Sequence, residues 1–223
     1  MTIKENILEI LDDIKKYSPN PEKVKLVAVT KYVDSDTIKE VLKTGVNILG
    51  ENKVQVIEEK RKELPENEYD IKWHFIGNLQ KNKVKYIASY IDMVHSINKL
   101  SLAEEIDKRA KSHNRKIDVL LEINISEEES KEGYILKELL EDIPKLLKLE
   151  NINICGLMTM APFEEDEEKI RTIFRNLRLL KEKWNKEYFN GQLKELSMGM
   201  SQDYKIALEE GATLIRVGSK IYK

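Results

Sequence analysis

The hydrophobic residues of this chain follow two alternating patterns. Short runs rich in Val, Ile and Leu are typical of buried strands, and the segments between them carry apolar residues every three or four positions, as amphipathic helices do. A helical pattern also covers residues 3–17, and Pro19 and Pro21 end it before the first run. The pattern predicts eight strands, over residues 24–31, 46–50, 71–77, 91–96, 117–125, 152–157, 193–197 and 213–217.

Helices are predicted between these strands. They cover residues 51–64, 79–90 and 100–112 among others, and the longest carries an apolar stripe from Ile170 to Trp184. The charged residues on the outer face of the helix over 51–64 are expected to be exposed to solvent.

The alternation of strands and helices predicts an α/β fold. Strands that are joined by helical crossovers run parallel, and eight such units favour a closed (β/α)8 TIM barrel with an extra N-terminal helix. An open doubly wound sheet is the alternative. No linker or change of composition divides residues 1–223, so one domain is predicted. In such barrels the functional site lies at the C-terminal ends of the strands.

The composition restricts the class of partner. The chain has 38 Lys and Arg against 40 Asp and Glu, a formal net charge of -2, so no basic field suggests nucleic acid. No apolar stretch approaches the roughly 20 residues that a membrane span needs, and the first residues do not resemble a signal peptide. The single cysteine, Cys155, lies in an apolar run and is expected to be a buried, inert thiol. We expect a cytoplasmic protein without a membrane partner.

Lys31 is the first candidate for chemistry, because it follows an apolar run and would reach the mouth of the barrel. Residues 197–201 follow the seventh strand, where Ser201 could bind a phosphate group or merely cap the next helix. A second glycine and serine, Gly218 and Ser219, follow the eighth strand. Barrels frequently bind phosphate between the loops after these two strands, so the two turns support each other.

A lysine and a phosphate site at one barrel mouth predict a ligand with both a carbonyl group and a phosphate. Phosphosugars and pyridoxal 5′-phosphate both fit, because both form imines with a desolvated lysine. The residues alone leave this choice open. Arg216 interrupts an apolar strand, and a buried charge needs a partner, which could be a structural carboxylate or the ligand.

Several motifs together resemble the YggS/PROSC family of pyridoxal phosphate homeostasis proteins, whose barrel is similar to the N-terminal domain of alanine racemase. They run almost from end to end of the chain and keep the family's order. The matching segments are LVAVTK at 26–31, GENKVQ at 50–55, WHFIGNLQKNK at 73–83, GLM at 156–158, LSMGMS at 196–201 and RVGS at 216–219.

The resemblance implies a role for five residues. Lys31 would form the internal aldimine with pyridoxal 5′-phosphate, and Ser201, Gly218 and Ser219 would hold its phosphate. Arg216 matches the arginine that faces the pyridine nitrogen in the racemase-like fold. A cation that donates to this nitrogen keeps it unprotonated, which disfavours extensive carbanion chemistry.

Three further residues are expected in the pocket by the same resemblance. Asn52 and His74 lie at predicted strand ends, and Met158 would pack near the ring, although an Asn cap and a hydrogen-bonded core His are common alternatives. The chain departs from the family pattern at two places. Asn78 stands where many members have His, and Ser-Ile-Asn at 96–98 stands where many have Ser-Val-Asp, which changes the electrostatics of the third and fourth strand ends.

The expected function is that of a carrier. Racemisation needs acid/base groups on both faces of the imine, and only Lys31 is identified; the sequence ends directly after the eighth unit, leaving no room for the racemase's second domain. We therefore expect no catalytic residue, no metal and no enzyme activity. The protein would hold pyridoxal 5′-phosphate as a reversible Schiff base and release it or pass it to apoenzymes, as a monomer. A single-domain amino acid racemase and a Schiff-base phosphosugar aldolase are the alternatives.

Lys81 and Lys83 lie near a predicted strand end and are candidates for a secondary attachment or release site, although exposed helix lysines are the simpler interpretation.

Overall fold

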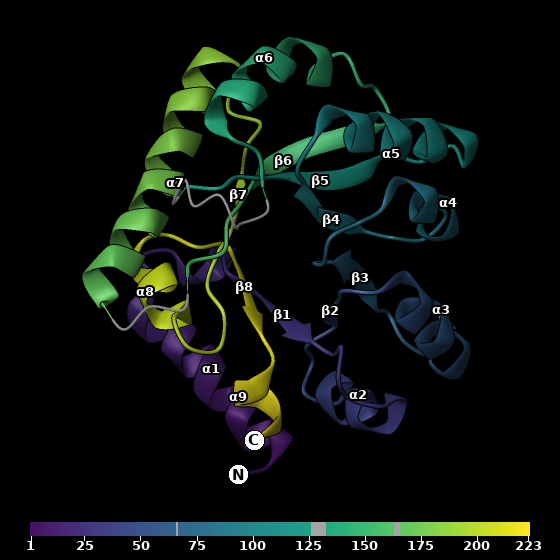
Figure 1. Ribbon diagram of the computed structural model, residues 1–223. Coiled ribbons are helices and arrows are strands. Elements are labelled where there is room, and N and C mark those ends of the chain that lie inside the picture. Colours follow the sequence, from purple (N-terminus) through teal and green to yellow (C-terminus); the bar gives the residue numbers. More distant parts are fainter. Residues whose placement is uncertain (66, 126–132, 163–165) are drawn as a thin grey trace.

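The computed structural model describes residues 1–65, 67–125, 133–162 and 166–223. Within these ranges, eight parallel strands form a closed barrel in chain order (Figure 1). The strands are β1 (Lys25–Val29), β2 (Ile48–Glu51), β3 (Lys72–Phe75), β4 (Met93–Ile97), β5 (Ile117–Glu122), β6 (Ile152–Met158), β7 (Glu195–Ser197) and β8 (Leu214–Val217). β1 pairs with both β2 and β8, which closes the sheet. The predicted TIM barrel is confirmed.

Helices surround the barrel and alternate with its strands (Figure 1). They are α1 (Ile3–Tyr17), α2 (Ser35–Leu42), α3 (Val54–Glu63), α4 (Val84–Ile87), α5 (Leu100–Ser112), α6 (Leu136–Leu146), α7 (Glu167–Glu187), α8 (Tyr204–Glu209) and α9 (Ser219–Tyr222), with 3-10 turns η1 (Pro21–Lys23) and η2 (Lys81–Lys83). The extra helix α1 packs against α8 and α9, where Asn6 Nδ2 donates to the carbonyl of Ile221 at 3.0 Å. The two ends of the chain therefore lie side by side.

Three predicted elements have different bounds in the structure. The predicted helix over residues 51–64 begins only at Val54, because Glu51 still belongs to β2 and is fully buried. The predicted helix over 79–90 is reduced to the turn η2 and the single-turn helix α4. β1 ends at Val29, so Lys31 lies two residues beyond the strand.

The barrel interior changes from apolar to polar along the strands. An apolar cluster made only of strand residues lies inside it: Val27, Met93, Leu120, Cys155, Met158 and Leu214. Side chains two positions apart on a strand share a face, so His95, Glu122 and Arg216 continue the inward face toward the C-terminal ends. All three are buried. A polar layer therefore lies above an apolar plug.

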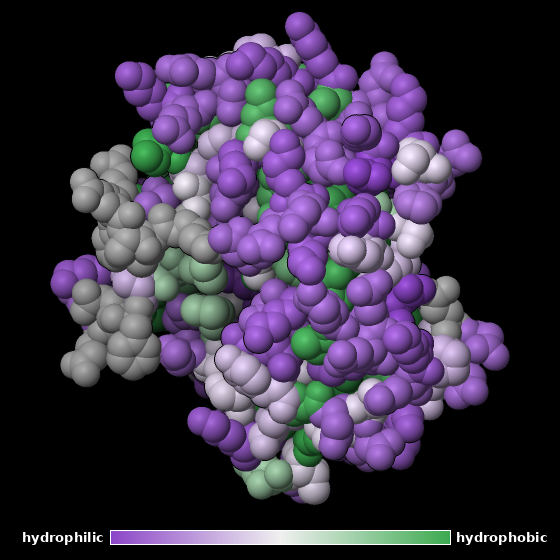
Figure 2. Space-filling view, turned by 45° about the vertical axis from the view of Figure 1, so that its right-hand side comes forward, coloured by the Kyte–Doolittle hydropathy of each residue, from purple (hydrophilic) through white to green (hydrophobic). Residues whose placement is uncertain are grey.

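The face of the molecule that Figure 2 shows is mostly polar. In Figure 2 hydrophilic side chains cover most of the visible face, with scattered hydrophobic residues between them. Among the described helices, none combines the length and apolar character that crossing a membrane requires. Cys155 is 7% exposed, and burial raises the pKa of its thiol, as expected for an inert core cysteine.

Candidate functional site

A cavity of about 630 Å³ lies at the C-terminal ends of the strands. Six of the residues singled out in the sequence line it: Lys31, Asn52, Ser201, Arg216, Gly218 and Ser219. The other two, His74 and Met158, do not belong to its wall. Met158 is 1% exposed and packs in the apolar plug, while Met160, two residues later, reaches the cavity.

Lys31 lies in the loop between β1 and α2. Asp34 caps α2 by accepting a hydrogen bond from the Thr37 amide at 2.9 Å, which ends the loop. The Lys31 ammonium group lies 4.9 Å from the ring centroid of Tyr32 and forms no ion pair with a described carboxylate. Its amine is therefore available to a ligand in the cavity.

A buried ion pair holds the backbone directly before Lys31. Lys60 Nζ donates to Glu51 Oε1 at 2.6 Å and to the carbonyl of Thr30 at 2.7 Å, and the Thr30 hydroxyl donates to the same Glu51 oxygen at 2.6 Å. Lys60 was expected among the exposed charges of its helix, and this expectation is wrong, since only 8% of the residue is exposed. The neighbouring apolar Val56 and Ile57 are the only local signal that this face turns inward.

The loops after β7 and β8 are joined through Ser201. Its Oγ accepts hydrogen bonds from the amides of Gly218, at 3.2 Å, and Lys220, at 3.4 Å. Gly199 has a φ of +92°, and a Cβ on it would lie 2.6 Å from the Cβ of Ala207, so this turn requires glycine. The Ser201 hydroxyl of the turn after β7 therefore meets backbone amides of the turn after β8 at the cavity wall.

Asn52 is positioned by the loop after β3. A Cβ on Gly77 would lie 2.6 Å from the backbone oxygen of Asn52, so only glycine allows the two segments to approach this closely. Both residues line the cavity, as does Asn78. Asn78, one of the residues at which the chain departs from the family pattern, thus belongs to the cavity wall.

Four buried polar side chains form a hydrogen-bonded chain across the barrel. Arg216 Nη1 donates to Ser197 Oγ at 2.5 Å, and its Nη2 donates to the carbonyl of Thr159 at 3.2 Å. Ser197 Oγ lies 2.8 Å from His95 Nδ1, and His95 Nε2 lies 2.9 Å from His74 Nδ1. His74 therefore acts in the layer beneath the cavity and supports Arg216 only through two other side chains.

Proton positions in this chain follow from the arginine. A guanidinium can only donate hydrogen bonds, so the Ser197 hydroxyl accepts a hydrogen bond from Arg216. We assign the hydroxyl as the donor of a second hydrogen bond, to His95 Nδ1. His95 then carries its proton on Nε2 and donates to His74, an assignment made from the hydrogen-bond network. Burial lowers the pKa of His74 to about 3 and that of His95 well below its usual value. Both imidazoles are consequently neutral near pH 7.

Arg216 remains charged despite its burial. Burial lowers the pKa of its guanidinium to about 10, while the charges of Asp203 and Glu122 act in the opposite direction. Its described hydrogen bonds go to neutral groups of β7 and of the segment after β6. It thus brings a positive charge and unused N–H donors to the cavity wall.

Two of the cavity residues that the sequence reasoning missed carry buried hydroxyls. Ser96 Oγ and the Tyr222 hydroxyl are buried atoms without a hydrogen-bond partner among the described residues, and both residues line the cavity. Burial raises the pKa of Tyr222, and the charge of Glu51 adds to this shift. Buried hydroxyls without partners are suited to a polar ligand or water. Ser96 could have been found from its position at the end of β4, whereas nothing local distinguishes Tyr222.

The two lysines considered for a secondary role belong to η2. Neither lines the cavity of Lys31. Lys83 lies beside a smaller cavity of about 250 Å³, and its ammonium group lies 5.7 Å from the ring centroid of Tyr86. A secondary role for Lys81 or Lys83 stays a prediction.

Comparisons with known proteins cover the whole barrel. The family model described as "Alanine racemase, N-terminal domain" matches residues 3–223. A pyridoxal phosphate homeostasis protein of Aquifex aeolicus is 39% identical over 100% of this chain and 98% of its own length, and that of Escherichia coli K12 is 30% identical over 99% and 95%.

Solved structures give the same picture. PipY of Synechococcus elongatus, solved with PLP bound, matches with a TM-score of 0.90 and 31% identity, and the match covers 100% of both chains. An alanine racemase of Clostridium difficile matches with a TM-score of 0.76 and 19% identity, over 98% of this chain and 59% of that protein. The second similarity concerns the barrel fold alone.

Proposed function

This chain belongs to the pyridoxal phosphate homeostasis proteins of the alanine racemase N-terminal domain family, and we propose that it binds pyridoxal 5′-phosphate in the cavity beside Lys31. One observation carries the proposal. A lysine without an ion pair to a described carboxylate, the joined turns at Ser201 and Gly218, and the buried cation Arg216 all line a single cavity. An amine, a phosphate site and a cation are the groups that this cofactor needs.

The residues present fit the cofactor. When bound, pyridoxal 5′-phosphate supplies an aldehyde that condenses reversibly with a primary amine and releases one water. Lys31 supplies the amine. Ser201, Gly218 and Ser219 would hold the phosphate, while Asn52 lines the wall beside them.

The buried hydroxyls and Arg216 complete the fit. Ser96 and Tyr222 offer hydrogen bonds that described groups do not use, and the guanidinium offers donors only. A ring nitrogen of the cofactor beside Arg216 would have to accept a hydrogen bond from the guanidinium and would remain unprotonated. This would weaken the ring as an electron sink. His74 and Met158 would act from beneath the cavity.

A carrier role follows from the acid/base groups of the cavity. Racemisation needs a second group that exchanges a proton on the face opposite the lysine. Glu122 and Tyr222 also line the cavity, and burial raises the pKa of Tyr222, which weakens its hydroxyl as a base. We therefore propose that residues 1–223 act as one cytoplasmic domain and a monomer, which holds the cofactor and releases it or passes it to apoenzymes without turnover.

An absorption spectrum combined with borohydride reduction tests the proposal. We expect a visible band that borohydride removes, and a tryptic peptide in which the cofactor is fixed to Lys31. Lys31→Ala should lose the band, whereas Lys43→Ala, on the exposed end of α2, should keep it. A phosphosugar lyase would have no such band, and a modified peptide that lacks Lys31 would contradict the assignment.

The carrier role has its own test. Racemase activity is followed by α-deuterium exchange over a panel of amino acids with the loaded protein. We expect exchange far below the ordinary enzymatic range of about 1 to 1000 per second. Turnover within that range would replace the carrier by a single-domain racemase while leaving cofactor binding intact.

A further inference from the structure

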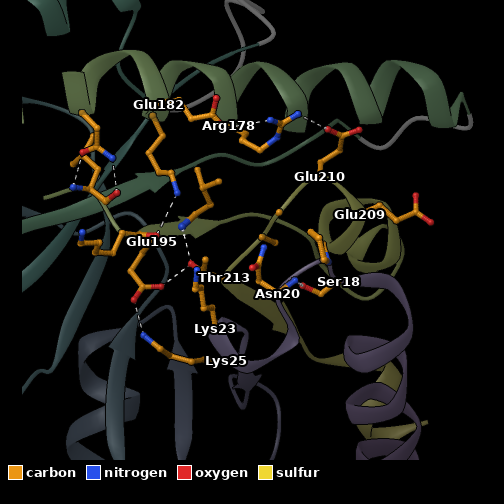
Figure 3. A pocket seen from close by; sticks show the side chains of 18 of the residues that line it. Ser18, Asn20, Lys23, Lys25, Arg178, Glu182, Glu195, Glu209, Glu210 and Thr213 are labelled. Carbon is orange, nitrogen blue, oxygen red and sulfur yellow. Dashed lines mark hydrogen bonds and ion pairs between the residues drawn. The ribbon is translucent and has the colours of Figure 1, made fainter. Parts of the chain in front are cut away.

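A second cavity lies at the opposite end of the barrel. Its volume is about 870 Å³, and the N-terminal residues of β1 and β7 line it together with the turn after α1 and one face of α7. Figure 3 shows Lys23 and Lys25 on one side of this cavity, and Arg178 and Glu182 on α7 across from them. The cavity therefore gathers charged side chains from segments that are far apart in the sequence.

The carboxylates of this cavity are already neutralised by neighbouring groups. The Glu195 carboxylate accepts hydrogen bonds from Lys25 Nζ and from the Thr213 hydroxyl, both at 2.6 Å (Figure 3). Glu210 pairs with Arg175 at 2.9 Å and with Arg178 at 3.4 Å. The remaining two, Glu182 and Glu209, pair with Arg178 and Arg171. These contacts tie α7 to α8, and β1 to the starts of β7 and β8.

Three lysines of the cavity take no part in these ion pairs. They are Lys23 of η1, Lys181 of α7 and Lys194, which directly precedes β7. Among the described residues no carboxylate lies within ion-pair distance of any of them, and Lys181 Nζ donates only to the carbonyl of Lys194, at 3.4 Å. Five cations and four carboxylates line the cavity, a formal excess of one positive charge, and these three lysines are the lining cations without a described ion-pair partner.

Lys181 is the least exposed of the three lysines. Burial lowers the pKa of its ammonium group; the charges of Glu182 and Glu195 oppose this shift, and the smaller effects of Lys23 and Lys194 add to it. Three like charges in a concave, partly desolvated site raise the local potential and attract counter-ions. The cost of holding them together falls when an anion enters.

We propose that this cavity is a binding site for a small anion with two or more negative charges, such as a phosphate or pyrophosphate group, held by Lys23, Lys181 and Lys194. Lysine ammonium groups bind phosphate as point charges and do not require the planar geometry that favours arginine. A nucleic acid is a poorer match, because the net charge of the chain is -2 and the three lysines lie around a cavity rather than along a surface stripe. The site is independent of the proposed cofactor.

Calorimetric titration with inorganic pyrophosphate tests the site. We expect saturable binding that weakens as salt is raised, and a loss of affinity of about tenfold in the double variant K181Q/K194Q, because two charge-assisted contacts disappear. The matched control is K183Q/K186Q, two exposed lysines on α7 that do not line the cavity, and its affinity should stay within about twofold of the parent. Orthophosphate and citrate, titrated in parallel, separate phosphate chemistry from charge alone.

A further variant distinguishes the two ends of the barrel. S201A removes the hydroxyl that joins the two turns of the Lys31 cavity, and pyrophosphate binding at the opposite end should survive it. If S201A removed binding and K181Q/K194Q did not, the pyrophosphate would occupy the Lys31 cavity and the proposal would be overturned. K23Q alters an exposed residue on a different segment and repeats the test if the double variant fails to fold. Parent protein that binds no pyrophosphate at low salt also contradicts the proposal.

Discussion

Positive charge is balanced in different ways at the two ends of the barrel. At the C-terminal end, Arg216 is buried and its described hydrogen bonds go to neutral groups, while Lys60 is buried against a fully buried carboxylate. At the N-terminal end, Lys25 and Arg178 pair with largely buried carboxylates, but 45% and 33% of the two cationic side chains are exposed, so water partly solvates these charges. Buried pairing fixes geometry strongly and tolerates little change, whereas surface pairing tolerates the loss of a partner.

The largest expected effect comes from the buried pair. Lys60→Met keeps most of the side-chain volume but leaves Glu51 as an unpaired buried charge, so the free energy of unfolding should fall by about 3 kcal/mol. Lys25→Met at the opposite end should lower it by about 0.5 kcal/mol, because 45% of that lysine side chain is exposed. Urea unfolding measures both. Equal losses in the two variants would remove the distinction between the ends.

The next effect concerns the hydrogen-bonded chain. Ser197→Ala removes the acceptor of Arg216 and the partner of His95, and leaving such buried groups unpaired should lower the free energy of unfolding by about 1 to 3 kcal/mol. Ser112→Ala, at the exposed end of α5, is the control and should change it by less than about 0.5 kcal/mol. Ser197→Ala should also alter the pH dependence of the cofactor's absorption, because Arg216 loses one of the hydrogen bonds that hold its guanidinium in place. An unchanged titration would separate Ser197 from the cofactor's environment.

The buried histidines predict a dependence of stability on pH. The pKa of His74 is lowered from 6.5 to about 3 in the folded protein, so the unfolded chain binds more protons between these values. Stability is therefore full above about pH 6.5 and falls as the pH is lowered toward 3, by roughly 1.4 kcal/mol per pH unit for this histidine. His74→Asn should flatten this slope when urea unfolding is compared at several pH values. A slope as steep as in the parent would show that His95 and the carboxylates cause it without His74.

The smallest expected effect concerns the three lysines at the N-terminal end. Without added anions, Lys181→Gln should change the free energy of unfolding by less than about 0.5 kcal/mol, because attraction and repulsion from the neighbouring charges oppose each other at this partly exposed lysine. Pyrophosphate should then raise the melting temperature of the parent protein more than that of the variant. Equal thermal shifts would argue that Lys181 does not contact the anion.

The barrel and several of the strand-end residues could be predicted from the sequence. Alternating periodicity predicts strands joined by helices, and in a parallel barrel the end of each strand reaches the same mouth. Lys31, Ser201, Gly218 and Arg216 could therefore be placed from local pattern alone. In the structure all four line one cavity.

The contacts between polar side chains inside the barrel could not be predicted in this way. Lys60 turns inward because Glu51, nine residues earlier, stays in β2, and His74 meets His95 across neighbouring strands. The Ser197 hydroxyl reaches His95 over a separation of 102 residues. Such contacts depend on strand register and on the closure of the sheet, so no local pattern contains them. The same closure brings Lys23, Lys181 and Lys194 to one cavity at the opposite end, although they lie on η1, on α7 and directly before β7.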